Sequence, residues 1–141
     1  MSRVYWDTML FVYLLENNPT HAPRVDSLLV RARRRRDSLF TSYLALGEIM
    51  AGVEKSHDSK AAGAVRDAVV KMGFSLLPFD GDAVAPFSKL RAHEKLKAPD
   101  AIHLACAASA GIDLFLTGDK QLVKLDVPGI QFIADFNTPI L

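Results

Sequence analysis

The chain has 141 residues, of which 50% are hydrophobic and 23% are charged. These proportions are ordinary for a globular protein, so they exclude a disordered chain and fit a single domain over residues 1–141. The 17 Lys and Arg residues against 16 Asp and Glu residues leave a net charge of +1, which excludes a strong overall field toward nucleic acid or membranes.

Short β-prone runs and amphipathic runs alternate along the chain. Unbroken apolar runs predict buried strands, and apolar residues at i, i+3 and i+4 predict helices. In chain order, we expect a strand at 4–6, helices at 9–15 and 23–36, a strand at 39–41, helices at 42–52 and 61–72, a strand at 74–79, helices at 84–90 and 99–110, and strands at 114–116 and 130–133. This alternation is typical of a parallel α/β sheet covered by helices.

Several of the predicted helices carry end signals. Ser42 and the turn at 80–82 suit N-caps, Pro99 suits the first turn of its helix, and Gly111 suits a C-terminal cap. The helix at 23–36 ends in consecutive arginines that spread round the helix, so we expect it to fray there.

The compartment is indicated by what the sequence lacks. A lone cysteine, Cys106, excludes an internal disulfide framework and a cysteine-rich zinc site, and it fits a reducing cytoplasm. Asp7 interrupts the longest apolar run, and no signal peptide is recognisable. We therefore expect a soluble cytoplasmic protein that does not enter a membrane.

Three acidic residues lie where other charges are missing. Asp7 and Glu48 are each the only charged residue in a long apolar stretch, and Asp100 is the only acid in its stretch. A carboxylate in such surroundings is costly unless it is paired or bound to a metal. These three residues are therefore candidates for a functional site.

A fourth acid, Asp119, follows the predicted strand at 114–116, as Asp7 follows the first strand. Ligands of open parallel sheets bind at the carboxyl ends of strands, near the reversal of strand order. Acids that meet there repel one another, and a hard cation such as Mg²⁺ relieves this repulsion while keeping waters for a substrate phosphate. The alternatives are local: Asp7 as a helix N-cap, Asp100 as an anion favoured by the helix dipole, and Glu48 as a partly exposed helix acid.

The motifs around these acids resemble the PIN-domain family, most closely the VapC-like toxin ribonucleases of toxin–antitoxin pairs. The motifs are Tyr5-Trp6-Asp7-Thr8, Leu46-Gly47-Glu48-Ile49, Pro99-Asp100-Ala101-Ile102-His103-Leu104-Ala105 and Thr117-Gly118-Asp119. The third is the most specific, and the resemblance covers essentially the whole chain. The chain departs from the common pattern with Met9 and Gly118 in place of Asn, Gly47 in place of Ser, and Gln121 in place of a further acid.

The resemblance implies a three-layer α/β/α fold with a parallel sheet of four or five strands. It also implies an Mg²⁺- or Mn²⁺-dependent endoribonuclease that leaves a 5′-phosphate, with Asp7, Glu48, Asp100 and Asp119 as metal ligands and catalytic residues. Because Gln121 removes a fifth acid, a second metal is less certain. Proteins of this kind usually form homodimers and are inhibited by an antitoxin whose tail lies in the groove near the active site.

Three residues beside the acids are auxiliary candidates. The hydroxyls of Thr8 and Thr117 could orient a ligand or water, or simply cap the turns that follow. His103 lies one helical turn after Asp100. It could donate a proton or bind phosphate, or be a packed histidine behind the acids.

Two basic stretches are candidates for RNA contact. Arg91, Lys95 and Lys97 precede the third acid and could guide RNA toward the metal, the alternative being a solvated loop. The arginine cluster at 31–36 could contact RNA, an antitoxin or another subunit, or be a solvated helix end favoured by the dipole. We expect the remaining histidines to lie at the surface: His21, His57 and His93.

Other functions remain as alternatives. A phosphatase of the haloacid dehalogenase type needs Asp-x-Asp after the first strand, and Met9 fills the second acid's place. A two-component receiver needs adjacent acids there, which are absent. A non-catalytic RNA- or protein-binding module would be expected to lose one or two of the acids, and none is lost. A PIN nuclease of RNA or DNA processing without an antitoxin stays open.

Overall fold

The computed structural model describes residues 1–56, 59–139 and 141, which form five strands and seven helices. The strands are β1 (Arg3–Trp6), β2 (Ser38–Ser42), β3 (Phe74–Leu77), β4 (Ile112–Thr117) and β5 (Ile130–Asp135). The helices are α1 (Thr8–Leu15), α2 (Ala22–Arg35), α3 (Tyr43–Ser56), α4 (Ser59–Lys71), α5 (Gly81–His93), α6 (Ala98–Ala110) and α7 (Lys120–Val123). None of these helices is both long and apolar enough to cross a membrane. His57, which we expected at the surface, lies outside the described residues.

The strands form one sheet in the order β3-β2-β1-β4-β5, and every neighbouring pair is parallel. The chain builds outward from β1 to β2 and β3, then returns to β4 on the other side of β1. Strand order therefore reverses at β1, where Val4 is in register with both Leu39 and Leu114. Ligand sites of open parallel sheets lie at the carboxyl ends of the strands beside such a reversal.

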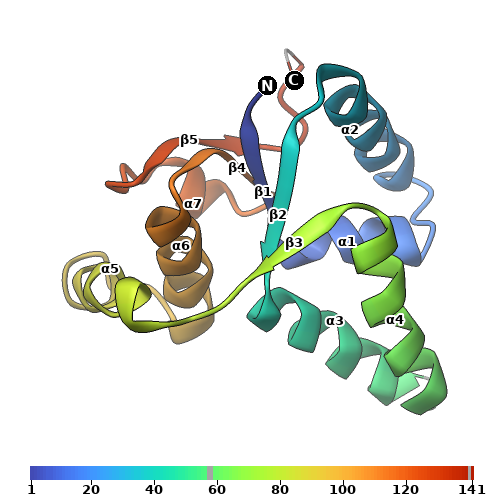
Figure 1. Ribbon diagram of the computed structural model, residues 1–141, viewed down its shortest axis with the longest axis horizontal. Coiled ribbons are helices and arrows are strands. Elements are labelled where there is room, and N and C mark those ends of the chain that lie inside the picture. The colour runs from blue at the N-terminus through green and yellow to red at the C-terminus, as the bar shows by residue number, and fades with distance from the viewer. Residues whose placement is uncertain (57–58, 140) are drawn as a thin grey trace.

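Helices cover both faces of the sheet. Figure 1 shows α1 to α4 on one side and α5, α6 and α7 on the other. Because successive side chains of a strand point to opposite faces, Val4 and Trp6 enter one core while Tyr5 enters the other. The domain is thus a three-layer α/β/α fold with a parallel sheet of five strands, which confirms the predicted fold class.

The core between the sheet and α1 to α4 is built on aromatic rings. The centroids of Trp6, Phe11 and Phe74 lie 4.7, 4.9 and 5.2 Å apart, and all three side chains are almost completely buried. Burial stabilises the fold by about 1.5–3 kcal/mol for a side chain of this size. This cluster anchors β1 and α1, the two elements that meet at Asp7.

The core on the opposite face depends on the close approach of α6, a helix rich in small residues. Ala101, Ala105 and Ala107 are fully buried in it. The loop before β5 runs so near this helix that a Cβ at Gly129 would lie 2.5 Å from the carbonyl oxygen of Ala108. Gly129 also has a φ of +98°, so the loop requires glycine at this position.

Two expectations about helices were wrong. The sequence missed α7, because a segment of four residues shows no helical period. The expected fraying at the end of α2 does not occur, since the helix continues through Arg35 and closes with Arg36 in the left-handed conformation (φ 58°). Basic side chains in the last turn interact favourably with the helix dipole, which outweighs their mutual repulsion.

Most element boundaries differ from the prediction by a few residues, and two of the differences have a clear physical reason. Helix α3 continues past Gly52 to Ser56, because a glycine is tolerated inside a helix that packs on its neighbours. Strand β3 ends at Leu77 and not at residue 79, because Pro78 has no N–H to donate to the sheet. Neither difference moves a candidate site residue.

We expect the Gly129→Ala variant to lose about 2–4 kcal/mol of the free energy of unfolding, because the new methyl group meets the α6 backbone in a strained conformation. Gly63→Ala is the matched control: Gly63 is exposed on α4, nothing lies within 4 Å of its Cβ position, and the variant should be slightly more stable. Urea unfolding followed by circular dichroism measures both. Equal stabilities would contradict the close approach of this loop to α6.

Candidate active site

Asp7 lies where β1 passes into α1. Its N–H still donates to the β4 carbonyl of Leu116 (2.9 Å), while its side chain caps α1. Oδ1 accepts a hydrogen bond from the Thr8 N–H (2.8 Å), and Oδ2 accepts one from Thr117 Oγ1 (2.7 Å). Asp7 is therefore an N-cap, as one alternative held, and is also fixed at the carboxyl ends of β1 and β4.

Glu48 reaches the same place from α3. Its Oε1 accepts hydrogen bonds from Thr8 Oγ1 (2.7 Å) and His103 Nε2 (2.6 Å). The bond from His103 is the main reason that the pKa of Glu48 lies below its usual value. Because 36% of the side chain is exposed, Glu48 lies partly against protein and partly open to solvent.

Asp100 and Asp119 complete the group. Partial burial, followed by the charges of Asp7 and Asp119, raises the pKa of Asp100 above its ordinary value of 3.8. Among the described residues, no N–H or O–H donates to the Asp100 carboxylate. Asp119 Oδ1 caps α7 by accepting from the Gln121 N–H (2.9 Å). Asp100 is therefore the one of these four carboxylates that accepts no hydrogen bond from the described residues.

The four acids line one pocket of about 340 Å³ at the carboxyl edge of the sheet, beside the reversal of strand order. Its other lining residues are Thr8, Met9, Tyr13, His103 and Gly118. The structure thus brings together all four acids that the sequence singled out. In residues 1–56, 59–139 and 141, no three Asp, Glu, His or Cys side chains form a ready-made metal-binding group.

Behind the acids, His103 is buried and bonded on both sides. Its Nδ1 lies 2.7 Å from Tyr5 Oη, which in turn lies 2.8 Å from Ser42 Oγ. The sequence named His103 as an auxiliary candidate but missed Tyr5 and Ser42. The available signal was a tyrosine inside a strand buried on both faces, because a buried phenol hydroxyl needs a hydrogen-bond partner.

Two of the departures noted in the sequence line the pocket. Met9 is an apolar side chain at the mouth, 44% exposed. A Cβ at Gly118 would lie 3.3 Å from Cε1 of Phe136, a buried residue that follows β5. The Phe136 ring would therefore have to shift by a few tenths of an ångström to admit an asparagine at position 118.

The remaining histidines differ in their surroundings. His93 is exposed at the end of α5, as expected. His21 is half-buried, because its ring packs against Tyr13 (4.4 Å between centroids) and Phe136 (5.5 Å), so the expectation of a surface residue was wrong there. This aromatic group backs the side of the pocket that Tyr13 lines.

The basic residues before α6 are exposed, but they are not equivalent. Arg91 donates from Nη1 to the carbonyl oxygen of Leu96 (2.7 Å), so it holds the loop that leads to Asp100. Lys95 and Lys97 are the exposed cations of that loop whose side chains make no hydrogen bond or ion pair with the described residues. Their contact with RNA stays a prediction.

The arginine cluster at 31–36 lies at the other edge of the sheet. Helix α2 ends directly before β2 begins, so the cluster is at the amino ends of the strands, opposite the acids (Figure 1). Three of its members are used within the fold: Arg31 donates to the Leu141 carbonyl, Arg33 donates to the Met72 carbonyl (3.3 Å), and Arg35 pairs with Asp37 (3.1 Å). The cluster is therefore poorly placed to guide RNA into the pocket.

The sequence model of the PIN domain family matches residues 4–128, a range that includes all four acids and the residues that hold them. The chain belongs to the PIN domain family. No curated protein sequence matches this PIN domain, but solved structures share its fold.

Three of these structures come from bacterial toxin–antitoxin systems. VapBC2 of Rickettsia felis, bound to a promoter DNA fragment, is 15% identical with a TM-score of 0.75 and covers 94% of this chain and 97% of its own. DNA-bound VapBC of Salmonella typhimurium is 21% identical with a TM-score of 0.75 and covers 96% and 99%. VapC20 of Mycobacterium tuberculosis, described as a sarcin-ricin loop cleaving toxin, is 16% identical with a TM-score of 0.64 and covers 87% and 96%. At these identities the likeness establishes the PIN fold.

The raised pKa of Asp100 makes a prediction about the stability of this PIN domain. A carboxyl whose pKa is raised by folding destabilises the folded state above that pKa and has no such effect below its unfolded value, 3.8 here. In EDTA at pH 7, Asp100→Asn should therefore raise the melting temperature by roughly 1–3 °C, and the gain should vanish below about pH 4.

Thermal melts from pH 3 to pH 8 measure this difference, with the exposed Asp67→Asn on α4 as the control. A lower melting temperature for Asp100→Asn at pH 7 would contradict a destabilising charge on Asp100 in the folded protein.

Proposed function

We propose that this PIN domain is a metal-dependent endoribonuclease, the toxin of a toxin–antitoxin pair, with Asp7, Glu48, Asp100 and Asp119 as its metal ligands and catalytic residues. The observation that carries the proposal is that these four carboxylates, from four separate elements, line one pocket at the switch point of the sheet. A purely structural role would not require four acids in one pocket, where burial and the charges of Asp7 and Asp119 raise the pKa of Asp100.

The donor set fits Mg²⁺, with Mn²⁺ as the alternative. Both are hard cations that prefer oxygen ligands, and the pocket's acidic donors are all carboxylates. Among the described residues, Glu48 Oε2, Asp119 Oδ2 and both Asp100 oxygens accept no hydrogen bond, so they are available to a cation. A bound divalent cation would stabilise charge on a phosphate and lower the pKa of a water molecule.

The protein's own groups would orient the acids for this chemistry. Thr117 Oγ1 and the Thr8 N–H hold Asp7, while Thr8 Oγ1 and His103 Nε2 hold Glu48. These donors fix both oxygens of Asp7 and one oxygen of Glu48. A water positioned in the pocket would attack the phosphorus in line with the departing oxygen, leaving a 5′-phosphate on one RNA fragment.

An antitoxin partner is supported by the surface next to the acids. An apolar groove beside Glu48 is lined by Val12 and Leu15 of α1 and by Ile49 and Val53 of α3. A partner segment in this groove would cover apolar surface and reach the pocket. Each structure named VapBC contains a chain with the fold of this protein, and the VapBC family is described as toxin–antitoxin systems. This supports the same kind of partner here. A homodimer stays a prediction that sedimentation can check.

Cleavage of a labelled pool of structured RNA tests the proposal. We expect cleavage with Mg²⁺ or Mn²⁺, none with EDTA, and a loss of more than about 100-fold in Asp7→Asn and Asp100→Asn, because each removes a cation ligand. Asp67→Asn, the exposed control on α4, should cleave like the wild type.

Each contrary result has a distinct meaning. Cleavage that survives in Asp7→Asn would refute the assigned residues. A folded, antitoxin-free protein that binds RNA but cuts none would favour the non-catalytic module. Cleavage of single-stranded DNA at an equal rate would favour a nuclease of nucleic-acid processing.

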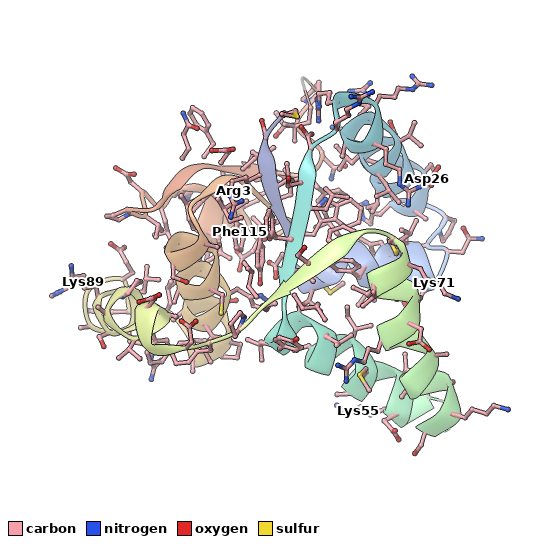
Figure 2. The ribbon with its side chains drawn as sticks, viewed as in Figure 1. Arg3, Asp26, Lys55, Lys71, Lys89 and Phe115 are labelled. Atoms are coloured by element: carbon pink, nitrogen blue, oxygen red, sulfur yellow. The ribbon has the colours of Figure 1, made fainter. Side chains whose placement is uncertain are left out.

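The loop before α6 gives a second prediction, measured with inactive Asp100→Asn protein so that RNA stays intact. Replacing Lys95 and Lys97 with Ala should lower the slope of log affinity against log salt by about 0.7 for each lost phosphate contact. Lys55 and Lys71, which lie on α3 and α4 on the opposite side of the sheet from α5 (Figure 2), are the control pair for the same substitution. An unchanged slope in the Lys95/Lys97 variant would remove this loop from the RNA path.

A further inference from the structure

A buried chain of hydrogen bonds runs behind the acids and ends on one of them. It connects Ser42 Oγ to Tyr5 Oη (2.8 Å), Tyr5 Oη to His103 Nδ1 (2.7 Å), and His103 Nε2 to Glu48 Oε1 (2.6 Å). Ser42 and Tyr5 are 0% exposed and His103 is 3% exposed. Glu48, at the end of these hydrogen bonds, is the member with a solvent-exposed side chain, at 36%.

Packing alone does not explain why residue 5 is a tyrosine. The Tyr5 ring stacks on Phe115 with 4.8 Å between centroids and 8° between planes, and a phenylalanine would make the same contact. A buried hydroxyl costs free energy unless it is hydrogen-bonded, and its net gain when bonded is small. The Tyr5 hydroxyl is therefore explained by its hydrogen bonds with Ser42 and His103.

These hydrogen bonds join three elements: β1, which leads into Asp7, α3, which carries Glu48, and α6, which carries Asp100. Tyr5 lies two residues before Asp7 on β1, and His103 lies one helical turn after Asp100 on α6. Ser42 accepts from the Ala45 N–H (3.1 Å), at the start of the helix that carries Glu48. The bonds thus form a closed circuit through β1, α6 and α3, and a shift of one element would break a bond in it.

We propose that Tyr5, supported by Ser42, is a positioning residue that fixes the His103 imidazole so that Nε2 holds Glu48 Oε1 and leaves Oε2 for the cation. This inference rests on the proposed function, since it assigns these hydrogen bonds a role in preparing the same pocket. A side chain held at one oxygen loses less rotational freedom when a ligand binds at the other.

The experiment compares Tyr5→Phe with Ile112→Val. Tyr5→Phe removes one oxygen atom and keeps the ring on Phe115. Ile112 is buried in the same core at the far end of β4. Ile112→Val is therefore a control for a small loss of stability that leaves the hydrogen bonds from Ser42 to Glu48 unchanged. Mn²⁺ affinity is measured by calorimetry on metal-free protein, kcat and KM on the RNA cleaved by the wild type, and stability by thermal melting.

We expect Tyr5→Phe to weaken Mn²⁺ binding by about 10-fold and to lower kcat by a similar factor, with KM for RNA within about two-fold of the wild type. Ile112→Val should show a comparable drop in melting temperature and neither of the other effects. In a Glu48→Gln background, Tyr5→Phe should have no further effect on Mn²⁺ affinity, because its influence passes through the Glu48 carboxylate.

The outcomes separate the two proposals. A wild type that binds Mn²⁺ and cleaves RNA, with Tyr5→Phe indistinguishable from Ile112→Val, would overturn the positioning role alone. A wild type that neither binds Mn²⁺ nor cleaves RNA would overturn both proposals. If Tyr5→Phe does not fold, Ser42→Ala tests the same chain with the Tyr5 ring intact, and unchanged Mn²⁺ affinity there would overturn the role.

Discussion

The position of β1 at the centre of the sheet is the constraint on which the site depends. Only four residues long, it has a neighbour on each side and a helical layer against each face. The side chains of its last two residues lie in opposite cores, Tyr5 in one and Trp6 in the other. A slip of the strand by one residue would therefore move each side chain into the wrong core. Asp7, the next residue, is thereby placed at the switch point with little freedom.

Around this fixed point the acids fall into two kinds. Asp7 and Glu48 are held by hydroxyl, amide and imidazole donors, which compensate their charge and restrict their rotation. Asp100 has no such donor among the described residues, and its pKa is raised first by its partial burial and then by the charges of Asp7 and Asp119. The protein thus stabilises part of the negative charge itself and leaves the rest uncompensated. Functional sites are commonly the places where folded proteins tolerate such a cost.

The sequence predicted the fold and the four acids because both depend on short-range patterns. Apolar periodicity defines the strands and helices, and Asp7, Glu48 and Asp100 are visible as charges in apolar stretches. Tyr5 and Ser42 were missed because their role depends on contacts across 98 and 37 residues of sequence, which no local spacing encodes. The regular end of α2 was missed for a related reason: adjacent arginines predict repulsion, but the dipole and their contacts with the body of the fold decide the outcome.

The contact between Gly118 and Phe136 bears on how this chain can diverge from its relatives. Phe136 cannot easily retreat, because its ring packs on Tyr13 and Arg24 Nε bonds to its carbonyl oxygen (2.9 Å). A side chain gained at position 118 would press on that ring, whereas a smaller residue at position 136 would first leave room for it. The two positions are therefore epistatic, and the order of substitution matters. A lineage acquiring asparagine beside Asp119 passes most easily through the loss of this phenylalanine, so the two replacements should be found together.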